Sequence, residues 1–190
     1  AGIIVAQYFG AGKKKALRSA VFNSALVTAI FGIVISLLSV PAAKPILELL
    51  NVPDKLIGDS AVYMQIACGG TIAVAAYNWI NAIMRALGDS KTPLIFLGAA
   101  SLLNALLDLL FVVVFKFGIA GAAWATVLTQ ALSAISCIVY CFAVSGEIKL
   151  TADDMHADKD MMCRCVKTGV PIAIQNGLIS VSMVALQRVT

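Results

Sequence analysis

The chain has 190 residues, of which 61% are hydrophobic and 13% are charged, and its formal net charge at pH 7 is +4. That charged share is about half of what an ordinary soluble domain carries. The single histidine, His156, and the Cys163-x-Cys165 pair match no zinc-binding spacing, and no acids or histidines converge in a pattern that indicates an enzyme.

The charges are bunched, and long apolar windows separate them. Residues 92–115 carry one charge, Asp108, and the other windows carry none: 20–43, 60–84, 117–146 and 168–187. Each window has about the 20 residues that a helix needs to cross a bilayer. The sequence therefore predicts an all-α, polytopic transmembrane helix bundle of about five full spans. Residues 1–10 read as the end of a further, partial span.

The first predicted span, about 19–40, follows the loop "GAGKKKALR" at 10–18. This loop lacks the spacing of a phosphate-binding loop and reads as a turn with basic anchors. The next connection, 41–59, contains three prolines around "ILELL", which indicates a short helix at the membrane interface.

The second span, 60–87, carries Tyr63 and Asn81 and ends in the tight turn "RALGDSKTP". Gly88 suits a helix C-cap, Asp89 or Ser90 suits an N-cap, and Pro93 suits the first turn of the next helix.

The third span places Asn104 and Asp108 four residues apart, hence on one helix face. A carboxylate facing lipid costs roughly 2.5–3.5 kcal/mol, so this face is expected to point into the bundle. Two interpretations remain open. The pair is either a polar contact that joins helices, or a site where Asp108 takes up a proton or a cation.

The fourth span carries Thr126, Thr129 and Gln130. Thr129 and Gln130 are candidates for lining a cavity, although threonine in membrane helices often bonds its own backbone instead. The polar segment 147–167 then links to a fifth span that begins near Pro171. This long link divides the chain into residues 1–146, a linker at 147–167, and residues 168–190 as the start of a second bundle.

Basic residues alternate between the two sides of the predicted spans. Most of the 14 lysines and arginines fall in 10–18, 85–91 and 147–167, while the opposite connections hold only Lys44, Lys55 and Lys116. The positive-inside rule places the three basic loops in the cytoplasm. This bias explains the net charge, so no nucleic-acid partner is expected.

Three stretches together, "RALGDSKTP", "NALLDLLF" and "GIAGAAWATVLTQ", resemble the MATE family of multidrug and toxic compound extrusion transporters. The resemblance extends from "VAQYFGAGKKKALR" to "VPIAIQNGL" and implies a piece of a twelve-helix, two-lobe transporter. It covers the end of helix two to the start of helix seven, with 147–167 as the inter-lobe connection.

The resemblance also implies a coupling site for Na⁺ or H⁺. The residues that match the family's site are Asp108, Asn104, Thr126, Tyr63 and Asn81. Of these, Asp108 and Asn104 are the expected Na⁺ ligands, and no organic cofactor is expected. Tyr63 has an alternative reading as an interfacial anchor.

The function that follows is secondary active efflux of amphipathic or cationic drug-like compounds, by a monomeric, multi-pass protein of the cell membrane. One alternative is a related lipid-linked saccharide flippase, whose cavity is expected to contain several basic residues. Another is a non-transporting membrane subunit in which Asn104 and Asp108 serve as interhelical contacts.

Overall fold

The computed structural model describes residues 1–49, 53–144 and 156–187, and all of its regular elements are helices. In chain order they are α1 (Gly2–Gly10), α2 (Lys14–Leu49), α3 (Asp54–Gly69), α4 (Thr71–Ala86), α5 (Lys91–Asp108), a π-helix η1 (Leu109–Val114), α6 (Gly118–Val144) and α7 (Lys159–Gln187).

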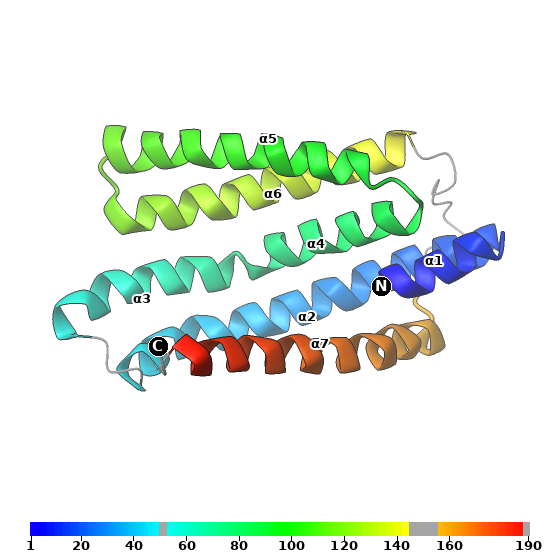
Figure 1. Cartoon of the computed structure of the whole chain (residues 1–190), viewed down its shortest axis with the longest axis horizontal. Coiled ribbons are helices and arrows are strands. Elements are labelled where there is room, and N and C mark those ends of the chain that lie inside the picture. The colour runs from blue at the N-terminus through cyan, green and yellow to red at the C-terminus, as the bar shows by residue number, and fades with distance from the viewer. Residues whose placement is uncertain (50–52, 145–155, 188–190) are drawn as a thin grey trace.

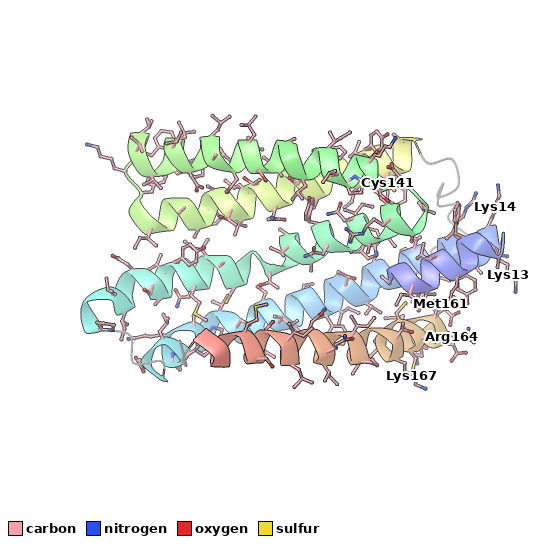
Figure 2. The ribbon with its side chains drawn as sticks, viewed as in Figure 1. Lys13, Lys14, Cys141, Met161, Arg164 and Lys167 are labelled. Carbon is pink, nitrogen blue, oxygen red and sulfur yellow. The ribbon has the colours of Figure 1, made fainter. Side chains whose placement is uncertain are left out.

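The helices run nearly parallel or antiparallel in one elongated bundle (Figure 1). The hairpin of α5 and α6 forms one side, α3 and α4 lie end to end in the middle, and α7 runs beside α2 on the other side. The α1–α2 turn, the α4–α5 turn and the start of α7 all lie at the same end. Lys13, Lys14, Arg164 and Lys167 gather at that end too (Figure 2), as the alternation of basic loops predicted. We call it the basic end.

The outer surface of the bundle is apolar, as expected for helices in lipid. Large side chains such as Leu37, Leu94 and Ile95 are about 70% exposed. Three described helical segments are long and apolar enough to span a membrane: Lys14–Glu48, Lys91–Val114 and Gly118–Ala143. The bent pair α3–α4 gives a fourth candidate. The expected fifth span falls within α7 and stays a prediction.

The prolines after the first span do not end the helix. We expected a break near Pro41, but α2 continues through Pro41 and Pro45 to Leu49. A proline removes one backbone hydrogen bond, whereas unwinding the segment would expose several more unpaired backbone groups in an apolar environment. The prediction of a separate interface helix at "ILELL" is therefore wrong, because the described residues of this stretch, 46–49, form the last turn of α2.

The second span is broken where the sequence predicted one helix over 60–87. Helices α3 and α4 meet at Gly70 with a bend of 43°. Gly70 is buried against α6, and a Cβ atom added there would overlap Val127 Cγ2 and lie 2.9 Å from Cγ1. Gly69 has open space at the same position. The absence of a side chain at residue 70 thus permits α6 to approach the break.

Replacing Gly70 by alanine is expected to lower the free energy of unfolding by about 1–3 kcal/mol, because the new methyl group overpacks against a stiff valine. Thermal unfolding of the full-length protein in detergent measures this loss. Gly69→Ala serves as the matched control, and Val127→Ala in the Gly70→Ala background should restore part of the stability. Equal stability of the two alanine variants would contradict the close-approach explanation.

The core lies toward the basic end, where α4 packs against α1, α2 and α6. Ile80 and Ile83 of α4 are almost fully buried together with Leu17 and Val21 of α2. Trp79 extends this contact, since its indole Nε1–H donates to Ser24 Oγ at 3.0 Å.

The start of α7 belongs to the same core. Asn23 of α2 is fully buried; its amide accepts a hydrogen bond from the Asp158 backbone N–H at 2.8 Å and donates to the His156 carbonyl at 3.1 Å. Asp158 in turn caps α7 by accepting from the Asp160 N–H at 2.9 Å. Cys165 is 5% exposed in the core cluster. We expected a linker up to residue 167, but its last nine residues, 159–167, are helical.

The turn between α4 and α5 has the geometry that its sequence predicted. Gly88 has φ +89°, its N–H donates to Arg85 O, and the Asp89 N–H donates to Met84 O at 3.0 Å, which is a Schellman C-cap. Of the two N-cap candidates, Asp89 provides the bond: its Oδ1 accepts from the Thr92 N–H at 3.0 Å. Hydrogen bonds from the side chain and backbone of Thr92 hold the pKa of Asp89 below its ordinary value.

The pKa of Asp89 is lower in the folded protein than in the unfolded chain. Its carboxylate therefore stabilises the turn at pH values above the pKa of the unfolded chain, and this stabilisation is lost as the pH falls through the pKa of the folded protein. Asp89→Ala should cost about 0.5–1 kcal/mol at pH 7 for this mostly solvated cap. The difference from wild type should shrink below about pH 4. Thermal unfolding across this range measures it. Asp89→Asn, which keeps the acceptor, should lack the pH-dependent step, and a pH-independent deficit of Asp89→Ala would contradict the assignment.

Candidate functional site

The polar face of α5 is built by helical spacing. Ser101, Asn104 and Asp108 recur at three, four and seven residues and so share one side of the helix. Asp108 is the last residue of α5, and the π-helix η1 follows it directly. In η1 the Phe115 N–H donates to Leu110 O, five residues back, at 2.9 Å. Such wide turns are frequent at functional sites.

Helix α6 presents its own polar residues to this face. Together with α4 they enclose a cavity of about 110 Å³, which we call the site cavity. Its polar lining residues are Tyr77, Ser101, Asn104, Thr126, Thr129 and Gln130. A polar cavity of this size can hold water. No lysine or arginine lines it.

Five buried side-chain atoms in the described part of the chain have no hydrogen-bond partner, and all belong to residues singled out from the sequence. They are Asn81 Oδ1, Asn104 Nδ2, Asp108 Oδ1, Thr129 Oγ1 and Gln130 Oε1. An unpaired buried polar atom costs about 1–3 kcal/mol, so such atoms are rare in folded proteins. Their concentration on α4, α5 and α6 marks this region as a site.

Four of these five atoms are oxygens, and that determines the chemistry the site can perform. Oxygen atoms accept hydrogen bonds and are the ligands that hard cations prefer. A carboxylate, an amide and a hydroxyl without donors can be satisfied by a proton, a cation or water. The described residues contain no group of three or more His, Cys, Asp or Glu able to hold a metal ion, so a transition-metal centre is not indicated.

Thr126 and Thr129 both line the site cavity but differ in their bonding. Thr126, expected from the family resemblance to belong to the site, is exposed, and its hydroxyl donates to Ala122 O at 3.1 Å. Thr129, expected only as a lining residue, is 3% exposed and its Oγ1 is unpartnered. The backbone bond anticipated for Thr129 therefore occurs at Thr126 instead.

Asn81 and Tyr63 do not meet Asn104. Asn81 lies in a neighbouring cavity of about 270 Å³ between α4 and α5, the inner cavity, whose polar lining residues are Tyr77, Asn78, Asn81, Arg85 and Ser90. Tyr63, on α3, is 42% exposed and lines neither cavity.

Two residues of the site cavity were not among the predicted site residues. Tyr77 lines both cavities and is 7% exposed, and Ser101 lies one turn before Asn104. A signal existed for each, because Tyr77 precedes Asn81 by four residues and Ser101 precedes Asn104 by three. Neither spacing says which neighbouring helix completes the cavity.

The fold and the site together define a polytopic α-helical membrane protein with a polar site inside its helix bundle. Comparison with known proteins makes this class specific. A family model described as MatE matches residues 1–110, and the chain belongs to this family of membrane transporters.

The relatives are named as multidrug resistance proteins. A probable multidrug resistance protein, YpnP of Bacillus subtilis, is 34% identical over 76% of this chain and 32% of its own length. The probable multidrug resistance protein NorM of Thermotoga maritima is 24% identical over 100% of this chain and 41% of its own length. This chain thus spans well under half the length of these relatives.

Solved structures confirm the fold. A transporter of the MOP superfamily from Pyrococcus furiosus superposes with a TM-score of 0.87 at 21% identity, covering 96% of this chain and 40% of that one. A multidrug resistance MATE family transporter in an inward-facing conformation gives 0.82 at 22% identity, covering 90% and 39%. The polytopic bundle predicted from the apolar windows is confirmed.

Two buried hydroxyl groups allow a test of the unpartnered atoms. Ser24 is 2% exposed, and its Oγ accepts from Trp79 and donates to Val21 O at 3.0 Å. Ser24→Ala should lower the free energy of unfolding by about 1–3 kcal/mol, because Trp79 loses its partner. Thr129→Val, which replaces an unpartnered hydroxyl by a methyl of similar shape, should be neutral or stabilising by up to ~1 kcal/mol.

Thermal unfolding of both variants in sodium-free detergent solution makes this comparison. If Thr129→Val loses as much stability as Ser24→Ala, the Thr129 hydroxyl has a partner in the folded protein, and its assignment as a free site atom is wrong.

Proposed function

We propose that the full-length protein exports amphipathic, often cationic compounds across the cell membrane, in exchange for Na⁺ or H⁺, with Asp108 as the coupling group. The naming of its relatives as multidrug resistance proteins supports the substrate class. In this proposal the protein acts as a monomer, needs no organic cofactor and has its basic end in the cytoplasm.

The observation that carries the proposal is the set of unpartnered buried polar atoms on α5 and α6, which includes Asp108 Oδ1. Asp108 Oδ1, Thr129 Oγ1 and Gln130 Oε1 lie on two adjacent helices, where no described residue donates to them. A structural polar pair between helices would use such atoms to bond each other. Here the amide of Asn104, one turn from Asp108, leaves its own Nδ2 unbonded as well. These atoms are therefore better explained as ligands than as interhelical contacts.

Alternating access follows from what the site does when filled. A proton or cation neutralises Asp108 and satisfies neighbouring oxygens, so it lowers the free energy of whichever conformation holds those oxygens close together. Only this difference in affinity between two conformations can shift their populations. A coupling of 1–3 kcal/mol, which is typical, corresponds to a change of about 5- to 150-fold in the ratio of conformations.

The cavity linings favour drug export over the flippase alternative. A lipid-linked saccharide carries phosphate groups, for which a cluster of basic residues is expected. Among the residues that line the site and inner cavities, Arg85 is the one basic residue, and it lines the inner cavity. The carboxylate of Asp108, one helical turn beyond Asn104 on α5, instead favours positively charged partners.

Asp108→Asn should reduce gradient-driven efflux by about ten-fold or more. The asparagine amide cannot take up and release a proton, and it lacks the negative charge that attracts a cation. Efflux of a fluorescent cationic dye from everted vesicles, with Na⁺ and pH gradients imposed separately, measures the loss and identifies the coupling ion.

Asp59→Asn is the matched control, because Asp59 is an exposed acid on α3 outside both cavities. It should export like wild type. Equal membrane insertion of all variants is checked by their amount in the purified membrane. Wild-type efflux by Asp108→Asn would show that the Asn104–Asp108 pair is structural.

A further inference from the structure

The inner cavity has a positively charged lining residue, whereas the lining of the site cavity carries no charge. Arg85 is its one charged lining residue, and Ser90 and Asn78 add hydrogen-bonding groups near it. The nearby carboxylate of Asp89 already accepts a bond from the Thr92 N–H and does not line the cavity. The cavity therefore suits a negatively charged group.

Helix α5 packs chiefly on α6 and makes few contacts with α4. The two helices α4 and α5 therefore diverge after their short turn, and the cavity lies between them. Its α5 side is mostly apolar and is formed by Pro93, Leu94 and Leu97. Leu94 is 68% exposed and Leu97 is 49% exposed. One side of the cavity is thus continuous with the apolar surface of the bundle, next to the α4–α5 turn at the basic end (Figure 1).

Asn81 supplies an independent sign of a ligand. Its side chain is 6% exposed, it lines the cavity, and its Oδ1 has no hydrogen-bond partner. An unpartnered acceptor requires a donor, which a bare anion does not provide. A ligand that satisfies both groups directly therefore combines a negative group for Arg85 with a hydrogen-bond donor for Asn81.

We propose that the inner cavity binds the headgroup of an anionic phospholipid that also carries a hydroxyl group. The phosphate contacts Arg85 and Ser90, the headgroup hydroxyl donates to Asn81 Oδ1, and the acyl chains follow Leu94 and Leu97. Charge-assisted bonds from arginine to phosphate are among the strong ones, and basic pockets between membrane helices on the cytoplasmic side are suited to such headgroups.

The apolar wall favours a lipid over a soluble anion. A small anion would leave Leu94 and Leu97 without a partner of matching chemistry, whereas an acyl chain covers both. This inference does not depend on ion coupling, so it can fail while the proposed export stands, and the reverse also holds.

The test is lipid binding to the delipidated full-length protein in detergent, followed by native mass spectrometry. The probes are phosphatidylglycerol, phosphatidylethanolamine and phosphatidylcholine of equal chain length. Phosphatidylglycerol should bind most tightly, because it alone combines a net negative charge with a hydroxyl donor. Arg85→Gln should weaken its binding about five-fold or more, as expected from roughly 1 kcal/mol per basic residue at the membrane surface. Arg85→Lys should retain most of it.

Asn81→Ala should reduce the preference for phosphatidylglycerol over phosphatidylcholine, and its thermal unfolding shows whether it is folded. Lys13→Gln is the matched control, because Lys13 is an exposed basic residue at the same end and outside the cavity. Equal weakening by Arg85→Gln and Lys13→Gln would overturn the proposal in favour of diffuse charge attraction. Equal affinity for the three lipids would overturn it too, as would competition by free glycerol phosphate at the lipid's own concentration.

Discussion

A membrane interior offers no water to unpaired polar groups, and this constraint organises the whole bundle. Where a polar side chain is buried for structure, the protein supplies its partners, as it does for Asn23, Ser24 and Trp79. At Asn104 and Asp108 the described residues leave polar atoms unpaired. The contrast within one bundle separates polar groups that hold helices together from polar atoms that have no partner among the described residues.

The packing that surrounds these atoms explains how they stay unpaired without collapse of the site. Helix α6 contacts α3, α4 and α5, and the glycine at residue 70 lets the α3–α4 break approach it closely. Since α6 is held by α3 and α4 as well as by α5, its position beside α5 does not depend on bonds between the unpartnered atoms. The same anchoring leaves α5 free of α4 beyond their turn, which opens the inner cavity.

The sequence predicted what depends on local chemistry and missed what depends on neighbours. A lone acid in an apolar window identifies Asp108, its spacing adds Asn104, and "LGD" specifies a C-cap followed by an N-cap. The break at Gly70 and the continuation of α2 through Pro41 were not predicted, because both are decided by the cost of unpaired backbone and by contact with another helix. Likewise, Asn81 and Asn104 could not be assigned to separate cavities before the divergence of α4 and α5 was known.

The attachment of α7 has a mechanical consequence. Its first turns are fixed to α2 through the hydrogen bonds of Asn23 and through the burial of Cys165. Pro171 lacks an N–H, so the carbonyl of Lys167 has no helical donor just past the fixed turns. The later part of α7 can therefore tilt relative to the first turns of the helix, which are fixed to α2. Pro171 is therefore a point inside α7 at which the helix can bend.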